Sequence, residues 1–456
     1  MDDAAISLGQ TLQGVLDRQR AAANAEAYPT LAARKDRLRR AIEVLITNEK
    51  RIVEACHADF GNRHEALSLL TEVMAPVRSL KHALKNVERW MRPEKRRPEF
   101  PMGLMGARAY IFYQPLGVIG VVVPWNAPVA LAYTPLAGIF AAGNRAMIKL
   151  SEFVPTVSAL TAEMTRAAFD ETEVAIINGE ADVAAAFTAL PFDHLLFTGG
   201  AGTARHVMRA AANHLVPVTL ELGGKSPAIV AEGADLAKVA AKVVFGKLAN
   251  AGQVCMAPDF ALVHRRDRDT FVEAVRSEML KQFPDVSSNP DFTNVHLPKQ
   301  RQRLAAMVRE AGEGGGIVIT LSGESVAELT TTKRFPPVIV VDPKLDCRLM
   351  REEVFGPVLP VVSYERFEDL PKLLGTLTRP LAMYYLGGTR AQKDFMLRNT
   401  WAGGMSFDDI MLHPFMQDLP FGGVGESGMG RYLGFEGFKA FSNSKAVAEP
   451  PWIDAI

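Results

Sequence analysis

The segment most informative about the fold is His194-Leu195-Leu196-Phe197-Thr198-Gly199-Gly200-Ala201-Gly202-Thr203. Residues 194–197 predict a buried strand, a glycine-rich turn follows at once, and a helix begins near Thr203. A strand, a tight turn and a helix in this order direct backbone amides and the positive end of a helix dipole at a phosphate. Because the turn does not meet the pattern Gly-x-Gly-x-x-Gly, an ordinary glycine-rich turn is an equal alternative on this stretch alone.

Strands and helices alternate on both sides of this stretch. The predicted elements are strand 117–123, helix 135–142, strand 146–150, helix 156–169, strand 174–177, helix 181–190, strand 194–197, helix 203–213 and strand 218–221. Parallel strands need crossover connections, which helices supply. The alternation therefore predicts an α/β fold, with a parallel sheet covered by helices on both faces.

A second alternating series begins near Ser226. Its predicted elements are strand 228–230, helix 237–248, strand 260–263, helix 270–281 and strands at 316–320, 338–341, 358–363 and up to about 386. The chain before Trp90 is helical in pattern, and residues 92–108 are basic and rich in proline. A strand at 110–113 follows them, so this segment could form a hairpin outside the main domain.

The composition excludes several classes of protein. Apolar residues make up 48% of the 456 residues and charged residues 22%, which is typical of a globular chain. Lys plus Arg and Asp plus Glu balance at 51 each, so no positive field favours nucleic acid. Residues 109–144 carry no formal charge, but their four prolines favour a buried strand and helix over a membrane span.

The cysteines and histidines indicate a reducing compartment and no metal site. Three cysteines, at positions 56, 255 and 347, are too few and too scattered for a disulfide framework, so we expect a cytoplasmic protein. Cys56 falls on the apolar face of a predicted helix and needs no chemical role. The nine histidines are scattered without metal-ligand spacing.

Glu221 and Cys255 are the strongest candidates for chemistry. Glu221 ends the last strand of the first series, and Cys255 follows the first long helix of the second, so both fall at the seam where ligands favour binding. A thiol and a carboxylate brought together there can form a covalent acyl-enzyme and then hydrolyse it. The alternative for Cys255 is a buried inert thiol. Cys347 also has polar neighbours in the sequence, so composition does not distinguish Cys255 from Cys347.

Three further residues are candidates for binding. Asn126 lies between two prolines at the end of a buried strand, where its amide could hold an oxyanion or only cap a turn. Lys149 and Glu152 follow a strand of the same sheet, where a carboxylate can accept hydrogen bonds from a ribose. A solvated surface pair is the alternative for these two residues.

These segments resemble, in order and spacing, the motifs of the aldehyde dehydrogenase superfamily, over nearly the whole chain. The matching segments are Pro124-Trp125-Asn126, Lys149-Leu150-Ser151-Glu152, Phe197-Thr198-Gly199, Glu221-Leu222-Gly223-Gly224-Lys225-Ser226-Pro227, Gly252-Gln253-Val254-Cys255, Glu352-Glu353-Val354-Phe355-Gly356-Pro357 and Pro420-Phe421-Gly422-Gly423. The segments 255–259 and 419–430 look like those of class 3 enzymes, among them the bacterial coniferyl aldehyde dehydrogenases.

The resemblance implies three structural parts. They are a Rossmann-type cofactor-binding domain (1–97 and 118–223), an α/β catalytic domain (224–425) and a β oligomerisation arm (98–117 and 438–452). The implied assembly is a homodimer. Membrane-bound relatives carry an apolar tail after the last strand, and since the sequence ends at Ile456 without one, we expect no membrane anchor.

The implied activity is the NAD(P)-dependent oxidation of an aldehyde to its acid, through a thiohemiacetal and a thioester on Cys255. The aldehyde would be aromatic, such as coniferyl aldehyde, or a medium- or long-chain aliphatic one. Asn126 would hold the oxyanion with the Cys255 amide, and Glu221 would activate water. The residues implied in binding NAD, with NADP also possible, are Trp125, Lys149, Glu152, Thr198, Gly199, Gly200, Leu222, Glu353 and Phe355.

The chain departs from the family pattern at Gly200, Ala204 and Asp408, where Ser, Gly and Asn are usual. The first two changes remove a hydroxyl donor and add a methyl near the phosphate turn, and they permit a second hypothesis, a non-catalytic scaffold. A third hypothesis is acyl transfer from the thioester to coenzyme A. Glu221 argues against that transfer, and the intact set of Cys255, Glu221 and Asn126 argues against the scaffold.

Overall fold

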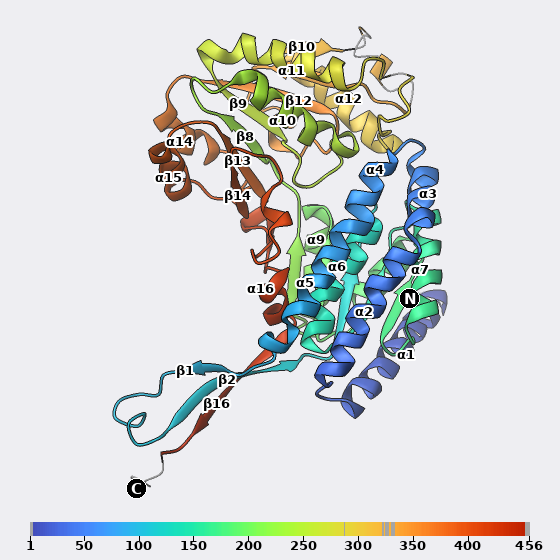
Figure 1. Ribbon diagram of the computed structural model, residues 1–456. Helices are drawn as coiled ribbons and strands as arrows, with labels where there is room; N and C mark the ends of the chain where they lie inside the picture. Colours follow the sequence, from blue (N-terminus) through green and yellow to red (C-terminus); the bar gives the residue numbers. More distant parts are fainter. Residues whose placement is uncertain (1–2, 287, 322, 324–327, 330–332, 452–456) are drawn as a thin grey trace.

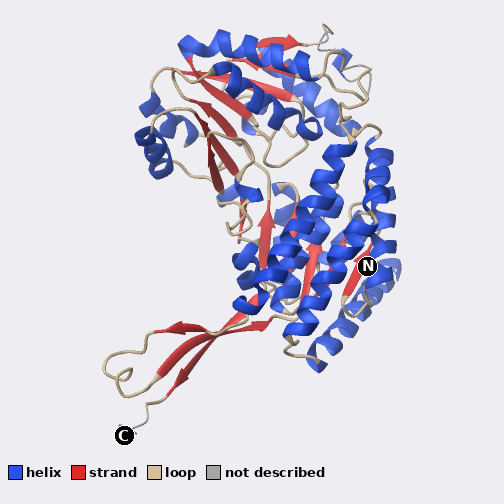
Figure 2. Cartoon of the chain, in the orientation of Figure 1, coloured by secondary structure: helices blue, strands red, loops and turns tan. Residues whose placement is uncertain are grey.

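The computed structural model describes residues 3–286, 288–321, 323, 328–329 and 333–451. Three sheets organise them, and Figure 1 shows two lobes joined by the chain, with a narrow β arm projecting from the lower lobe. Figure 2 shows that helices flank the sheets of both lobes, while the arm contains strands and loops. The predicted α/β fold is therefore confirmed.

The sheet of the first lobe has the order β15-β7-β6-β3-β4-β5. Its strands are β3 (Val118–Val122), β4 (Arg145–Lys149), β5 (Val174–Ile177), β6 (His194–Thr198), β7 (Val218–Glu221) and β15 (Gly428–Met429). The first five are parallel, as the alternation predicts. The short edge strand β15 is antiparallel to β7 and was not predicted, because a two-residue strand leaves no period in the sequence.

Side chains alternate between the two faces of this sheet, and each face is covered by its own helices. Val118 and Met147 pack with α1 (Asp3–Ala25), α8 (Ala181–Thr188) and α9 (Ala201–Ala212) on one face. Ile119 and Ile148 pack on the other face, in the larger of the two cores. The elements that cover that face are α2 (Leu31–Thr47), α3 (Glu49–Phe60), α4 (Glu65–Ser68), the π-helix η1 (Leu69–Met74), α5 (Ala75–Trp90), α6 (Pro128–Ala142) and α7 (Pro155–Ala168).

Helix α6 begins seven residues before the predicted start at 135. Pro128 occupies its first turn, where a missing N–H costs nothing, and Pro135 lies inside the helix rather than at its beginning. The uncharged stretch thus forms the buried strand β3 and the buried helix α6, as predicted. No helix in the part of the chain that the structure describes is long and apolar enough to span a bilayer.

The sheet of the second lobe has the order β10-β11-β12-β9-β8-β13-β14. Its strands are β8 (Pro227–Val230), β9 (Phe260–His264), β10 (Ile317–Thr320), β11 (Val338–Val341), β12 (Val358–Tyr364), β13 (Ala382–Leu386) and β14 (Gly404–Phe407). The helices of this lobe are α10 (Leu236–Leu248), α11 (Arg268–Gln282), α12 (Pro298–Glu313), α13 (Arg348–Arg351), α14 (Leu370–Leu374) and α15 (Arg390–Asn399). Strand β10 is antiparallel to β11, so the sheet is mixed at this edge.

The arm is a three-stranded antiparallel sheet with the order β1-β2-β16. Strand β2 (Arg108–Pro115) pairs with β1 (Glu94–Arg96) on one side and with β16 (Ser442–Glu449) on the other. Helix α16 (Gly434–Ala440) packs on α6 and leads into β16. The hairpin predicted outside the main domain is present. Its first strand, β1, lies before residue 98, where the sequence analysis places the start of the arm. The division into three functional domains stays a prediction.

Candidate active site

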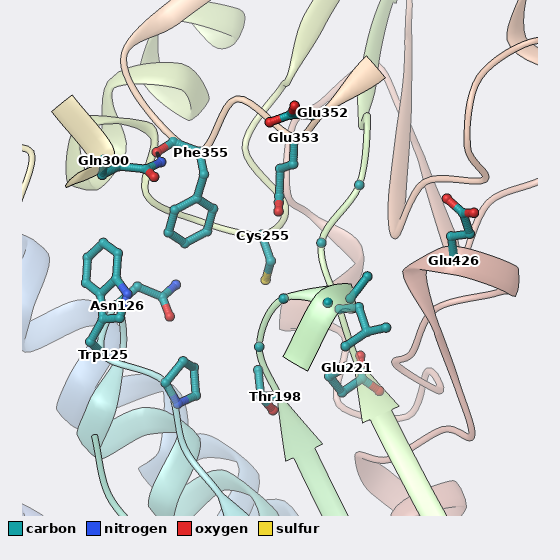
Figure 3. A pocket seen from close by; sticks show the side chains of 18 of the residues that line it. Trp125, Asn126, Thr198, Glu221, Cys255, Gln300, Glu352, Glu353, Phe355 and Glu426 are labelled. Atoms are coloured by element: carbon teal, nitrogen blue, oxygen red, sulfur yellow. Dashed lines mark hydrogen bonds between the residues drawn. The ribbon is translucent and has the colours of Figure 1, made fainter. Parts of the chain in front are cut away.

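Strand ends from both lobes meet at one cavity of about 710 Å³. In the first sheet β7, β6 and β3 are neighbours, and their carboxyl ends lead into Glu221, Thr198 and the segment 124–126. In the second sheet β9 and β12 are neighbours, and the segments that precede them carry Cys255 and Glu353. Figure 3 shows side chains from both groups of segments directed toward the space around Cys255.

The structure brings most of the predicted site residues together. Those that line the cavity are Trp125, Asn126, Thr198, Gly199, Gly200, Glu221, Leu222, Cys255, Glu353 and Phe355. Lys149 and Glu152 do not line it. Lys149 is buried, and its ammonium group donates to the carbonyls of Leu150 and Gly179 at 2.6 and 2.8 Å. The Glu152 carboxylate lies 3.8 Å from that ammonium, so the role of both residues in cofactor binding stays a prediction.

The segment before Cys255 has an unusual backbone. Asn250 and Ala251 both have a φ of 51°, and Gly252 follows with a φ of 73°. A Cβ atom at Gly252 would lie 2.3 Å from the carbonyl oxygen of Gly356, so only glycine fits where this turn meets the other loop. The buried Gln253 side chain fixes the turn further, since it donates to the carbonyls of Asn250 and Asn294 at 2.9 and 3.0 Å.

Asn126 is tied to the same turn. Its Nδ2 donates to the carbonyl of Gln253 at 3.1 Å, and its own backbone carbonyl accepts from Nδ2 of Asn250 at 3.3 Å. Because an amide nitrogen carries two hydrogens, the second remains available to a ligand in the cavity. The orientation of this amide toward Cys255 in Figure 3 agrees with the predicted oxyanion donor.

Glu221 is a buried carboxylate, with 3% of its surface exposed. Neither of its oxygens has a hydrogen-bond partner among the residues that the structure describes. Burial raises the pKa of this carboxyl well above its ordinary value, and the nearby guanidinium of Arg431 opposes the rise. A carboxyl group without structural partners in a cavity is typical of a functional site.

Cys255 is half-buried, whereas Cys56 is fully buried and packs in the core as predicted. Removal from water raises the pKa of the Cys255 thiol to about 12, and the negative charges of Glu353 and Glu221 add to the rise. The thiol and the Glu221 carboxyl therefore interact electrostatically. Deprotonation of the thiol requires either a base in the cavity or a ligand that stabilises negative charge.

Glu353 lies against the turn that follows Glu221. A Cβ atom at Gly223 would come within 1.9 Å of a Glu353 carboxylate oxygen, so this approach requires glycine. Burial raises the pKa of Glu353 to about 8, and the charge of Asp259 adds to the rise. The carboxylate thus reaches the junction between the two sheets.

Several cavity residues were not predicted. Gln300 and Arg303 come from the first turns of α12, a helix that the sequence analysis does not predict; residues 298–303 are polar, and the apolar face of the helix begins only at Leu304. Gln300 donates to the carbonyl of Phe355 at 2.8 Å, and Arg303 donates to that of Glu353 at 2.9 Å. The other residues of the lining are Pro124, Leu131, Ala201, Gly202, Arg205, Gly223, Gly224, Leu297, Arg351, Glu352, Thr378 and Glu426.

The turn between β6 and α9 fits the phosphates of a dinucleotide. No side chain caps the start of α9, and Cβ atoms at Gly200 and Gly202 would meet open space. Free amides at a helix N-terminus in a cavity provide an anion site. The methyl group of Ala204 is buried in the core beneath the sheet, so this departure does not obstruct the turn. No metal-binding cluster occurs within the described ranges.

The departure at Asp408 lies outside the cavity. This residue has a φ of 58°, a conformation that Asn and Asp tolerate better than most residues. Its carboxylate accepts from the backbone amide of Gly387 at 3.0 Å and pairs with Lys393. Asp408, which follows β14, therefore supports the loop between β13 and α15 rather than the groups around Cys255.

Comparison with known proteins agrees with this geometry. The model described as "Aldehyde dehydrogenase family" matches residues 13–447. A probable coniferyl aldehyde dehydrogenase of Caulobacter vibrioides is 44% identical over 440 residues, which are 96% of this chain and 90% of the relative. The coniferyl aldehyde dehydrogenase of a Pseudomonas species is 43% identical over the same shares of the two chains.

Solved structures share the fold. The substrate-bound AldH of Staphylococcus aureus superposes with a TM-score of 0.89 at 29% identity, over 97% of this chain and 95% of that one. An aldehyde dehydrogenase of Mycobacterium tuberculosis in complex with NAD+ superposes with a TM-score of 0.86 at 25% identity, over 98% and 92% of the two chains.

The raised pKa of Cys255 predicts how its alkylation by iodoacetamide depends on pH. The rate should rise about tenfold per pH unit up to at least about pH 9, because only the thiolate reacts. At about pH 9, above the pKa of Glu353, Glu353→Gln removes a negative charge beside the sulfur and should speed alkylation several-fold. Peptide mass mapping in a Cys347→Ser background isolates the reaction of Cys255, and a rate independent of pH would contradict the prediction.

Proposed function

The chain belongs to the aldehyde dehydrogenase family, an NAD(P)-dependent class of enzymes that oxidise aldehydes to acids, and we propose that it performs this reaction on aromatic aldehydes, with Cys255 as nucleophile. The observation that carries the proposal is the convergence of Cys255, Asn126 and an unpartnered Glu221 carboxyl on one cavity. These groups supply a nucleophile, an oxyanion donor and a base.

In the first half of the reaction the Cys255 sulfur attacks the aldehyde carbon and forms a thiohemiacetal. The sulfur attacks as the thiolate, so the thiol proton first leaves to water in the cavity, and the Glu221 carboxylate stays available for the second half. The charge that develops on the aldehyde oxygen is held by the Asn126 amide and the Cys255 backbone N–H. The oxyanion donor is preorganised, because both of its ends are hydrogen-bonded to the turn before Cys255.

NAD(P), when bound, supplies the acceptor for the hydride that leaves the thiohemiacetal carbon. The uncapped start of α9 would hold its phosphates, with Thr198, Gly199, Gly200 and Leu222 around it. Glu353 would accept from a ribose hydroxyl. Trp125 and Phe355, whose rings meet edge to face at 5.7 Å, would border the nicotinamide end. Loss of hydride leaves a thioester on Cys255.

In the second half, the Glu221 carboxylate takes a proton from water, and the resulting hydroxide attacks the thioester carbon and releases the acid and the thiol. The raised pKa of Glu221 makes it a stronger base once it has lost its own proton. Transfer of the acyl group to coenzyme A, the alternative reaction, would not need a base in this position. Glu221 therefore favours hydrolysis.

An aromatic aldehyde is the proposed substrate, because two relatives at 43–44% identity are described as coniferyl and probable coniferyl aldehyde dehydrogenases. We expect kcat/KM for coniferyl aldehyde to exceed that for propanal at least about tenfold, since the larger apolar group buries more surface in the site. Nicotinamide absorbance measured with NAD and with NADP tests both the substrate and the cofactor preference. An equal or higher value for propanal or for medium-chain aldehydes would contradict the aromatic assignment.

Replacement of Glu221 should separate the two halves of the reaction. Glu221→Gln is expected to keep a rapid first turnover and to slow the release of acid by about 10² to 10⁴-fold, because water loses its base. In the wild-type enzyme, release of the acid should speed up as the pH rises, since a raised pKa leaves less carboxylate at neutral pH.

The controls are Cys255→Ala, which should abolish the first turnover, and Cys347→Ala, which should leave it unchanged because Cys347 lies outside the cavity. A first turnover that survives in Cys255→Ala would overturn the assignment of the nucleophile. Formation of an acyl-coenzyme A as the main product would favour the alternative reaction.

We also propose a homodimer that associates through the arm, and a cytoplasmic location, which three free cysteines favour. Among the described residues, one edge of strand β16 in the arm sheet is unpaired. Phe100 and Leu104, in the connection between β1 and β2, are 84% and 78% exposed. Replacement of Phe100 and Leu104 by Glu should shift sedimentation toward the monomer. The matched change Leu215→Glu, at a residue that is 88% exposed elsewhere, should not, and equal effects would contradict this interface.

A further inference from the structure

A buried ion pair lies beneath the segment that carries Asn126. Arg63 follows α3 and Glu72 lies on the π-helix η1, and their side chains are 1% and 0% exposed. Nη2 of Arg63 lies 2.6 Å from Oε1 of Glu72 and also donates to Thr71 at 2.9 Å. Neither residue lines the cavity, and the sequence did not single out either of them.

Glu72 holds the start of α6. Its Oε2 accepts from the backbone amides of Val129 and Ala130, both at 3.0 Å. These amides belong to the first turn of α6, where N–H groups have no partner within the helix, and a negative charge there is also favoured by the helix dipole. Because α6 begins at Pro128, two residues after Asn126, this contact fixes the carboxyl side of the Asn126 segment.

Arg63 contacts Asn126 itself. Its Nη1 donates to the backbone carbonyl of Asn126 at 3.4 Å, and that carbonyl also accepts from Asn250 at 3.3 Å. The guanidinium lies 4.8 Å from the centre of the Phe60 ring. The ion pair therefore fixes the Asn126 segment at two points. Arg63 binds the Asn126 carbonyl, and Glu72 binds the first turn of the helix that follows.

The same contacts extend to the segment that carries Cys255. The Phe60 carbonyl accepts from Nδ2 of Asn294 at 3.0 Å, and the Asn294 carbonyl accepts from Nε2 of Gln253 at 3.0 Å. The Gln253 carbonyl is the group to which the Asn126 amide donates. A continuous set of contacts thus joins the ion pair, the first lobe and the turn before Cys255.

Stability alone does not account for such a pair. Taking two charges out of water costs several kcal/mol per ion, and well-packed apolar residues are often at least as stable in that place. A buried ion pair is better explained when it favours one conformation of the chain over others. Outside the pair itself, the hydrogen bonds of Arg63 and Glu72 go to the Asn126 carbonyl, to the first turn of α6 and to Thr71 on η1, which indicates what this pair specifies.

We propose that the Arg63–Glu72 pair positions the Asn126 amide at the Cys255 sulfur. This inference rests on the proposed role of Asn126 as oxyanion donor. Arg63 and Glu72 are positioning residues, since they touch neither substrate nor cofactor. Loss of the pair lets the Asn126 segment move and slows the formation and oxidation of the thiohemiacetal.

A double-mutant cycle tests the proposal with the full-length enzyme, NAD and an aromatic aldehyde that the wild type oxidises. Glu72→Gln keeps the size of the side chain and removes its charge, and it should slow the first-turnover rate about 10- to 100-fold. Asn126→Ala should slow the same step by about 10² to 10³-fold. In the Asn126→Ala background, Glu72→Gln should have no further effect, because the amide that it positions is absent.

Two further variants keep the test decisive. Arg63→Lys retains the charge opposite Glu72 but loses the fork that reaches the Asn126 carbonyl, so it should slow the first turnover even if Glu72→Gln folds poorly. Glu173→Gln is the matched control, since Glu173 pairs with Arg37 and Arg40 in the same lobe and does not line the cavity. It should lower Tm without changing the first turnover.

Fluorescence quenching by NAD and thermal unfolding are measured on each variant as readouts independent of turnover. Unchanged NAD affinity with a slowed first turnover supports the positioning role. Equal slowing by Glu72→Gln in the presence and absence of the Asn126 amide would overturn the inference, as would an unchanged first turnover in Arg63→Lys. A rapid first turnover in Asn126→Ala alone would instead contradict the proposed function.

Discussion

The carboxyl edge of the first sheet faces the amino ends of two strands of the second sheet, and the site exists only where these two edges meet. Glu221 is buried there without a hydrogen-bond partner among the described residues, and the Cys255 thiol has its pKa raised to about 12. Leaving polar groups unpartnered costs free energy. Such groups persist where a reaction needs them, because a desolvated carboxylate is a stronger base and a desolvated thiolate a stronger nucleophile.

Each of the two lobes contributes part of the site. Neither lobe contains a complete site, since Glu221 and Asn126 follow strands of the first sheet and Cys255 and Glu353 precede strands of the second. The catalytic groups therefore meet only if the two lobes pack in one defined relative position. Glycines permit the close approach of the Gly356 backbone to Gly252 and of the Glu353 side chain to Gly223, and buried polar groups such as Gln253 fix the direction of the turn.

The sequence predicts the fold to the extent that elements are periodic and apolar. Strands β5, β7 and β11 have the predicted bounds, and Glu221 and Cys255 are predicted at the seam between the two units. Helix α12 was missed because its outer face is rich in Lys, Arg and Gln, and β15 because it has only two residues. Helix α6 is longer than predicted, because the sequence predicts its start at Pro135, a residue that lies inside the helix.

The site is predicted less completely, because side-chain partners far apart in the sequence leave no local pattern. Lys149 has the predicted place at a strand end, yet its ammonium group is satisfied by two backbone carbonyls. Arg63 lies in a polar segment that looks like surface, and Glu72 is a single charge in a mostly apolar stretch, so neither indicates a partner, although the pair is buried. Their contact with the Asn126 segment comes from the packing of α6 on the N-terminal helices, which only the folded chain reveals.

If Cys255 is the nucleophile, a thioester forms on its sulfur, and acid-quenched mass spectrometry detects that bond on the protein itself. Glu221→Gln mixed with NAD and coniferyl aldehyde should gain the mass of one feruloyl group per chain, located by digestion on the peptide that contains Cys255. No added mass in the presence of a rapid first turnover, or an acyl group on another residue, would contradict the account.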